Sequence, residues 1–477
     1  MSRVTFWIAT PSNWYDGNRR GFVLVIVLWI ALGLIAIVLL FGEGMRMEYR
    51  AAANSAGGIE ADQAMAGVRR YITYSLGNLD APGTVPDPVT YAVEDVPIGE
   101  ASYWLLGRAD QDQMIAPDTP AYGFIDEASK LNLNAPTTTP EMLVALPNMT
   151  QDVVDAILDW KDADSDARPS GAESDYYLLQ NPPYNCKNGN FESVEELRLV
   201  KGVTTDLLFG EDTNLNGVLD PNENDGAASS PDDDADGKLK RGLLDFVTIY
   251  SQEPNTRADG SRRLNVNAIE RQQSTGPVTG DVALSVERYL NDTLGARRGT
   301  DIVKANGRDL PPRSVLEFYV RAAVTVEEAA KVEDALTASD PSKPIDGHVN
   351  VNTAPRETLV SLPGIGEQFA DALVSLRKTK TADQLNTVMW ITEVVDRANA
   401  VAAGPYITTK AYRLSADVAV VAANGRAFRR TWMVFDTSKT PPMVIYSRDR
   451  SGLGWPLGSE MRDALDNQQQ LVRKGLQ

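Results

Sequence analysis

The sequence predicts an α+β protein in which a long N-terminal helix precedes an antiparallel sheet, and a large helical segment interrupts that sheet. Three observations favour this fold. An apolar run near the amino end is long enough for a membrane-crossing helix. Alternating apolar residues within 79–130 and 405–450 are typical of strands, and helical patterns fill the sequence between them. The sheet is therefore expected to form from the two ends of the head, around an inserted helical domain.

The apolar run covers residues 22–41 and contains no charged residue. A helix of that length rises about 30 Å, which matches the hydrocarbon thickness of a bilayer. Arg19 and Arg20 precede it, so we expect the N-terminus in the cytoplasm and the head on the opposite side. A cleaved signal peptide is disfavoured, because its apolar region would be shorter and would end in a small-x-small site. Residues rich in Ala, Glu, Arg and Met continue the helix into a stalk.

The composition limits the chemistry that the head can perform. The 477 residues include 65 Asp and Glu against 46 Lys and Arg, a formal net charge of −19. Because nucleic-acid affinity comes largely from Lys and Arg that displace counterions, this charge disfavours DNA binding. Cys186 is the only cysteine and His348 the only histidine. The sequence thus excludes an intramolecular disulfide, a cysteine-based zinc cluster and most histidine-dependent catalysis.

Basic residues followed by Gly21, Phe22 and an unbroken apolar helix resemble the class III signal of type IV pilins and pseudopilins. The resemblance implies that a prepilin peptidase cuts after Gly21 and methylates Phe22. Most members carry a glutamate four residues beyond the phenylalanine, where this chain has Ile26. A carboxylate in lipid is costly and is tolerated there because it pairs with the terminal amine of a neighbouring subunit. Its absence is similar to the large minor pseudopilin, general secretion pathway protein K.

Motifs in the soluble part resemble the same protein K family of type II secretion systems. They are found at 122–177, at 190–203, in "LNVNAIE" and in "VNVNTAPRETLVSLPGIG". The resemblance implies a pilin-like fold with a large, mainly α-helical inserted domain. It also implies a role at the fibre tip in initiating or capping the pseudopilus, for protein export across the outer membrane. The partners implied are other minor pseudopilins, the major pseudopilin, the prepilin peptidase and the bacterial inner membrane, with a periplasmic head.

Two segments, 131–160 and 349–377, align as an internal repeat of an N-x-N strand, a helix, a Leu-Pro hairpin and a second helix. They are expected to form helix-hairpin-helix-like modules. Gly364 and Gly366 in the second copy can turn backbone amides toward an anion, but Glu367 and Asp371 follow where a phosphate site favours Lys. We therefore expect a tight packing hairpin and no nucleic-acid partner. The alternative is a membrane-anchored DNA-binding protein of a competence or type IV pilus system.

An acidic insertion carries the spacing of an EF-hand calcium loop. Gly217 stands at the sixth position, where the loop turns sharply, and the expected Ca²⁺ ligands are Asp212, Asn214, Asn216, Val218 through its carbonyl, Asp220 and Glu223. No helical pattern follows, so the sequence predicts an isolated, stabilising calcium loop rather than a paired sensor. A solvated acidic loop is the alternative.

Two further runs match the calcium-loop pattern in part. The second candidate starts correctly but has Lys240 and Leu243 where ligands belong, and its ligands would be Asp232, Asp234 and Asp236. The third has Ala167 in place of the glycine, and its ligands would be Asp162, Asp164, Asp166 and Glu173. Both are weaker than the first, since acidic runs at helix ends are often only solvated.

Motifs of catalysis are absent from the sequence: it contains no G-x-S-x-G, no Walker loop, no zinc-binding histidine pair and no Cys-His combination. We expect a protein that is not an enzyme.

The expected organisation is a leader at 1–21, a transmembrane and stalk helix at 22–78, the first part of the sheet at 79–130, a helical insertion with calcium loops at 131–345, the second hairpin module at 346–404, the last strands at 405–450 and a polar tail at 451–477.

Overall fold

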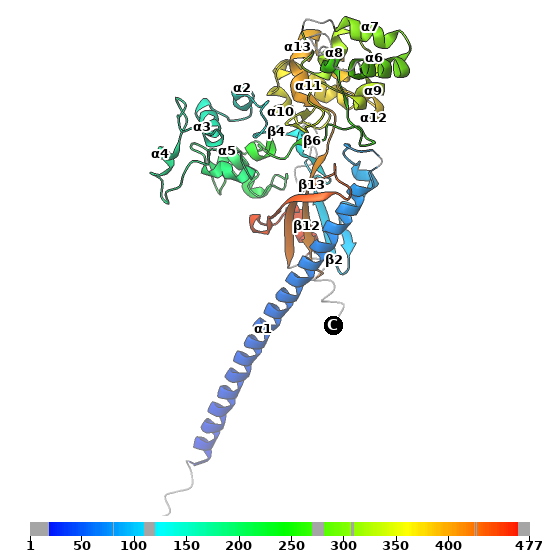
Figure 1. The fold of residues 1–477 in the computed structure, drawn as a ribbon. Coiled ribbons are helices and arrows are strands. Elements are labelled where there is room, and N and C mark those ends of the chain that lie inside the picture. Colours follow the sequence, from blue (N-terminus) through cyan, green and yellow to red (C-terminus); the bar gives the residue numbers. More distant parts are fainter. Residues whose placement is uncertain are drawn as a thin grey trace, which may run out of the picture.

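The computed structural model describes residues 19–79, 81–108, 120–269, 281–306, 310–423, 425 and 427–465. Figure 1 shows a long helix, α1, that extends from a head built of an antiparallel sheet and two helical lobes. One lobe, at the left of the view, carries α2 to α5, and the other, at the top, carries α6 to α13. The described part of the leader is confined to residues 19–21, so most of the predicted 1–21 segment lies outside the description.

Helix α1 (Arg19–Gly77) is 59 residues long and has two different environments. Its apolar half is not buried against any other part of the chain, and it is long and apolar enough to cross a membrane. Its other half packs against the sheet through a stripe at helical spacing: Ala61, Ala64, Val68, Ile72 and Leu76. The sequence prediction of a single-pass anchor that continues into a stalk is compatible with this helix.

The main sheet is antiparallel and combines strands from both ends of the head, as predicted. Its strand order is β1-β2-β12-β13-β14, and β3 pairs with β12 beyond the end of β2. The strands are β1 (Val96–Ile98), β2 (Ala101–Leu106), β3 (Ile125–Asp126), β12 (Arg413–Val421), β13 (Phe428–Asp436) and β14 (Met443–Asp449). Side chains alternate along β12, so one face packs on α1 and the other faces a smaller cluster around Trp104.

The helical lobes lie between β3 and β12 in the sequence and share one large apolar core. Their helices are α2 (Pro140–Val144), α3 (Gln151–Lys161), α4 (Ser174–Tyr177), α5 (Thr205–Phe209), α6 (Asp281–Leu294), α7 (Arg298–Ala305), α8 (Val315–Arg321), α9 (Val326–Val332), α10 (Arg356–Val360), α11 (Gly366–Arg377), α12 (Ala382–Leu385) and α13 (Arg397–Ala403). The pairs α2/α3 and α10/α11 fall where the repeat predicts helices. Their assignment as helix-hairpin-helix modules stays a prediction.

Within the described residues, the lobes contain three short parallel strand pairs, and all three share one register. They are β4 (Leu131–Asn132) with β5 (Val247–Thr248), β7 (Leu264–Asn265) with β8 (Leu336–Thr337), and β10 (Val349–Asn350) with β11 (Ile407–Thr408). In each pair an aliphatic residue faces an aliphatic residue, and an asparagine faces a threonine. We call these the first, second and third strand pairs. The sequence repeat predicted β4 and β10, one strand of the first pair and one of the third, and the structure adds their partners and the whole second pair. A further antiparallel pair joins β6 (Gln252–Glu253) to β9 (Ile345–Asp346).

Replacing Ile72 with alanine tests the packing of α1 on the sheet. Ile72 is 2% exposed, so the substitution leaves a cavity and should lower the free energy of unfolding by about 2–5 kcal/mol. The measurement is urea denaturation of the full chain in detergent. Tyr74→Ala, at a side chain that is 71% exposed on the same helix, is the control and should change stability far less. Equal effects of the two substitutions would contradict the packing described here.

Candidate calcium-binding loops

The third candidate loop brings its carboxylates together. Asp162 and Asp164 follow the end of α3, and Glu173 precedes the first residue of α4. One oxygen from each of these three side chains lies within 4.8 Å of the others. Among the described residues this is the only such group of three or more Asp, Glu, His or Cys side chains.

The oxygens of this loop are acceptors that lack donors. Four buried atoms have no hydrogen-bond partner: Asp162 Oδ1, both carboxylate oxygens of Glu173 and Asn188 Oδ1. The other oxygen of Asp162 accepts a hydrogen bond from Arg168 Nη1 at 2.6 Å. Buried acceptors without donors are costly, and carboxylate and amide oxygens are the ligands that Ca²⁺ prefers. The residues therefore fit a bound calcium ion.

Charge around Glu173 points to the same conclusion. Burial raises the pKa of Glu173, and repulsion from Asp159 and Asp162 raises it further. A cation at this position would offset that repulsion and favour the ionised carboxylate. Asp166, the remaining predicted ligand, is exposed; its backbone N–H donates to Asp164 Oδ1 at 2.9 Å and its side chain is not part of the group.

The first candidate loop is folded compactly, but its carboxylates hold backbone N–H groups. Asp212 accepts from Asn216 N at 3.0 Å and from Gly217 N at 2.9 Å. Glu223 accepts from Thr213 N and from Asp220 N, each at 3.1 Å. Gly217 has φ of +72°, the left-handed conformation that the sixth position requires.

The amide side chains of this loop converge on one acid. Asn214 Nδ2 and Asn216 Nδ2 donate to the same oxygen of Asp220, at 2.7 and 3.1 Å. The backbone N–H of Val218 donates to Asn216 Oδ1 at 2.7 Å. In this structure each acid is already satisfied by donors from the loop itself, and Asp212, Asp220 and Glu223 do not gather as the acids of the third loop do. Calcium binding here remains a prediction.

Burial makes the two inner acids of the first loop weak. It raises the pKa of Asp212 to about 6, with repulsion from Asp245 adding to the effect. Burial also raises the pKa of Glu223 to about 8, with Asp212 adding repulsion. Two buried carboxylates that oppose each other's ionisation are the electrostatic setting in which a divalent cation stabilises the ionised forms.

The second candidate loop already holds a cation of its own. Lys240 Nζ pairs with Asp234, and lies 4.0 Å from Asp236 Oδ2 and 3.8 Å from Glu211 Oε1. Asp232, which the pattern makes the first ligand, does not join them in any described ion pair. The lysine that breaks the sequence pattern therefore supplies the positive charge that a calcium ion would bring.

The glycine hairpin of the second repeat copy packs against helix α13. Gly364 has φ of +78°, and a Cβ at this position would lie 2.2 Å from the carbonyl oxygen of Asn399. Gly366 has φ of +56°, and its N–H donates to Leu362 O at 3.3 Å, as the N–H of Ile365 does at 3.1 Å. These amides are used within the hairpin, which fits a packing role and gives no support to an anion site.

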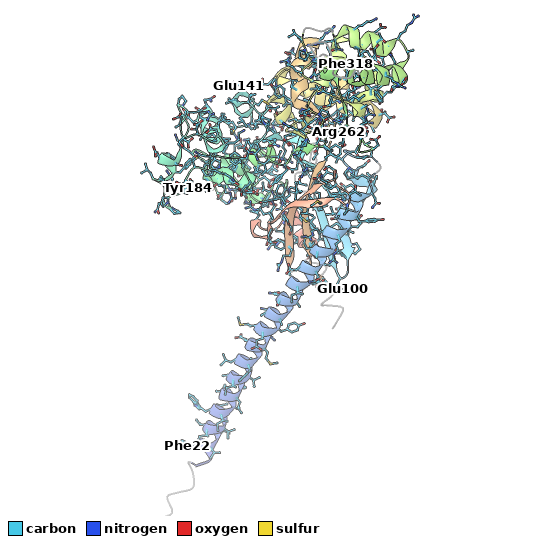
Figure 2. All side chains as sticks on the ribbon, in the orientation of Figure 1. Phe22, Glu100, Glu141, Tyr184, Arg262 and Phe318 are labelled. Atoms are coloured by element: carbon cyan, nitrogen blue, oxygen red, sulfur yellow. The ribbon has the colours of Figure 1, made fainter. Side chains whose placement is uncertain are left out.

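The predicted processing residues lie at the free end of the anchor helix. Figure 2 labels Phe22 at the end of α1 farthest from the head, where its side chain is 69% exposed. Gly21 is within the same helix, one residue closer to the N-terminus. The structure thus keeps the two residues apart from the head, and cleavage itself remains a prediction.

Sequence reasoning missed Asn188 and Asp159 at the third loop. Asp159 is fully buried and accepts from Arg168 Nη1 at 2.5 Å. A Cβ at Gly171 would lie 1.8 Å from Asp159 Oδ2, so the glycine lets the chain pass close to the acid. Asn188 falls outside any calcium-loop spacing, because it comes from a later part of the chain; its Nδ2 atom donates to the backbone carbonyl of Asp164. Asp159 falls on the apolar face that the periodicity of α3 predicts, which indicates that it is buried. No sequence pattern singles out Asn188.

These features define a class of protein in which a long helix, apolar enough to cross a membrane, packs its other half on an antiparallel sheet. The head of this protein carries acidic loops. Residues 129–209 match the family model described as Type II secretion system (T2SS), protein K. The match to the type II secretion system protein K family model is confined to this segment of the chain. The segment contains α2 to α5 and the third candidate loop.

Two curated proteins are similar over short segments. The Putative type II secretion system protein K of Escherichia coli (strain K12) is 31% identical over 102 residues, which are 21% of this chain and 28% of that protein. The Type II secretion system protein K of Pseudomonas aeruginosa is 41% identical over 64 residues, 12% of this chain and 19% of that protein. The chain thus spans less than a third of the length of either relative.

Among solved structures, the chain was matched to the crystal structure of the GspK-GspI-GspJ complex from the enterotoxigenic Escherichia coli type 2 secretion system. The match has a TM-score of 0.36 and 10% sequence identity, and covers 85% of this chain and 96% of that chain. A similarity this low carries no argument about the fold, which rests on the architecture described above.

The raised pKa of Glu223 predicts how stability depends on pH. Its pKa of about 8 in the folded chain exceeds its usual value of 4.5, so the folded state binds more protons than the unfolded state between these values. Stability without calcium should therefore fall as the pH rises from about 4.5 to about 8. The measurement is urea denaturation at several pH values in a chelator, and Glu223→Gln should flatten the slope. An unchanged slope in that variant would contradict the assignment.

Proposed function

We propose that this chain is a minor pseudopilin at the tip of a type II secretion pseudopilus, where it initiates or caps the fibre during protein export across the outer membrane. The observation that carries the proposal is the protein K segment, residues 129–209, set in a head that a long apolar helix anchors. A structural role agrees with a head whose described acidic groups suit metal binding and packing. We propose no catalytic activity.

The tip position is supported by the residue at position 26. A subunit that docks beneath another needs a carboxylate to meet its neighbour's terminal amine, and Ile26 has none. The proposed partners are other minor pseudopilins, the major pseudopilin and the prepilin peptidase. The proposed location is the bacterial inner membrane, with the N-terminus in the cytoplasm and the head in the periplasm. The DNA-binding alternative is not proposed, because the amides of Ile365 and Gly366 donate within the hairpin and the net charge is −19.

Mass spectrometry of the mature chain tests the processing step. In a host with a prepilin peptidase, the purified protein should begin at a methylated Phe22. The cut lies before the apolar helix, so the anchor is retained. Removing the peptidase from the same host is the control and should leave the leader attached. A chain that still begins at Met1 in the presence of the peptidase would reject the proposal.

Secretion by the host tests the role of the chain in export. Deleting this chain should leave the exported proteins in the periplasm, and expressing it from a plasmid should restore their release. Normal secretion by the deletion strain would contradict the proposed role in export, although the sequence similarity to protein K would stand.

We also propose that Ca²⁺ stabilises the head at the third loop, through Asp162, Asp164, Glu173 and Asn188, and at the first loop, through Asp212, Asn214, Asn216, Val218, Asp220 and Glu223. The unpartnered oxygens support the third loop, and the loop spacing with its two weak acids supports the first. Asp232, Asp234 and Asp236 are not proposed as ligands, because Lys240 lies among them.

Calcium titrations of single variants separate the two sites. Calcium at a hundredfold excess over its dissociation constant should stabilise the folded chain by about 2.7 kcal/mol per site, seen as a rise in melting temperature. Glu173→Gln and Glu223→Gln should each remove part of that rise. Asp166→Asn, at an exposed acid of the third loop, is the matched control and should keep it. If both glutamine variants respond to calcium as the original chain does, neither loop is a site.

A further inference from the structure

Arg263, the residue directly before β7, is a buried arginine with no close partner. Arg263 is only 8% exposed, and its Nε atom has no hydrogen-bond partner. Within the described chain, its guanidinium group makes no hydrogen bond and no ion pair of 4.0 Å or less. A buried charge without a close ion-pair or hydrogen-bond partner is unfavourable, so the surroundings of Arg263 require an explanation.

In the first strand pair, the basic residue at the position equivalent to Arg263 has a carboxylate partner. Lys130, directly before β4, pairs with Glu127 at 3.3 Å. Glu127 also accepts a hydrogen bond from Thr248 Oγ1, in β5, at 2.5 Å. The carboxylate therefore bridges the basic residue before one strand and the threonine of the other, and Glu127 is 1% exposed.

The third strand pair repeats the arrangement with different residues. His348, directly before β10, lies with Nδ1 at 3.3 Å from Glu253 Oε1. Glu253 accepts from Thr408 Oγ1, in β11, at 3.0 Å, and is 6% exposed. Two of the three strand pairs thus place a buried carboxylate between a basic residue and a threonine.

The second strand pair has the basic residue and the threonine but not the carboxylate. Thr337, in β8, shares a hydrogen bond with Ser339 Oγ at 3.0 Å instead. Arg263, Thr337 and Ser339 line a cavity of about 120 Å³. One water needs only about 10–15 Å³ of such space, so the cavity has room for a small ion together with water.

The acids that line this cavity are engaged elsewhere. Glu253 is bound to His348 and Thr408, as described above. Glu333 accepts from Thr387 Oγ1 at 2.7 Å and is attracted by Lys410, which also lines the cavity. Both acids attract Arg263 at longer range, but neither reaches it as an ion pair. A negatively charged ligand would lie beside these two carboxylates and be repelled by them. A ligand with a single negative charge is therefore favoured over one with more.

We propose that this cavity binds a small carboxylate ion, which takes the place that Glu127 and Glu253 occupy in the other two strand pairs. Its oxygens would accept hydrogen bonds from the guanidinium of Arg263 and the hydroxyl of Thr337. A guanidinium group matches a carboxylate in shape and donates along two parallel directions, which makes Arg263 well suited to this ligand. The site is independent of the calcium loops and of the proposed role in secretion.

Acetate is the probe that tests the proposal. Its dissociation constant for the full chain in detergent is measured by equilibrium dialysis of labelled acetate, with sodium chloride holding the ionic strength constant. Arg263→Met should weaken binding at least about tenfold, since it removes charge-assisted hydrogen bonds. Arg262→Met is the matched control, because Arg262 is the exposed neighbour labelled in Figure 2, and it should leave the constant unchanged. Thr337→Val should cause a smaller loss.

Several results would overturn the proposal. If no saturable binding is detected up to about 50 mM acetate, the cavity does not bind a carboxylate ion and the proposal is wrong. Equal affinities in the original chain and in Arg263→Met would place any bound acetate elsewhere. Tighter binding of inorganic phosphate than of acetate would contradict the carboxylate assignment. If Arg263→Met does not fold, Thr337→Val decides, because acetate binding that this variant leaves unchanged contradicts the proposed contact.

Discussion

The buried ion pair between Arg430 and Asp417 joins the sheet to the inserted lobes. Arg430 is fully buried in β13, and its Nε and Nη2 atoms lie 2.9 and 2.8 Å from the carboxylate of Asp417 in β12. Its two terminal nitrogens also donate to the carbonyls of Asn214 and Leu215, within the first candidate calcium loop. Arg450 completes the group at 2.7 Å from Asp417. Since a buried charge needs every partner, the loop and the sheet depend on each other's placement.

This contact gives the first loop a position as well as a shape. Its backbone carbonyls complete the hydrogen bonds of an arginine that the sheet buries, so movement of the loop would leave two donors of that buried charge without acceptors. The two arginines lower the pKa of Asp417, which stays ionised and holds both of them. The acidic insertion, which the sequence presents as a surface loop, is therefore part of the interface between sheet and lobes.

Much of the fold follows from sequence patterns because those patterns are local. The anchor helix follows from uninterrupted apolar residues, and the sheet follows from alternation at both ends of the head. The second strand pair escaped prediction, although "LNVN" at Leu264 repeats the signal of Leu131 and Val349. Its partner β8 is separated from it by α6 to α9, whose pattern lacks the Leu-Pro hairpin of the other two copies. Only the register of the folded strands reveals that the three pairs are equivalent.

The candidate sites were harder to rank, since spacing along the chain does not determine which oxygens are left without donors. The first loop has the full calcium spacing, but its acids bind the loop's own N–H groups. The third loop lacks the glycine of the pattern, but Asp162, Asp164 and Glu173 lie close together in the folded chain. Arg263 could not be singled out at all, because its unusual feature is a missing partner, which appears only when the three strand pairs are compared.

The pairing of β3 with β12 has a consequence for how such a head can vary. Asp126 lies opposite Leu414, so the chain leaves the sheet and returns to it at neighbouring positions. Glu127 fixes this junction by accepting from Ser415 Oγ at 2.6 Å. Closing a segment whose ends already touch adds little entropic cost as the segment lengthens. The lobes are therefore an insertion at one junction of the sheet. Their length can change without altering the sheet and the helix α1 that packs on it.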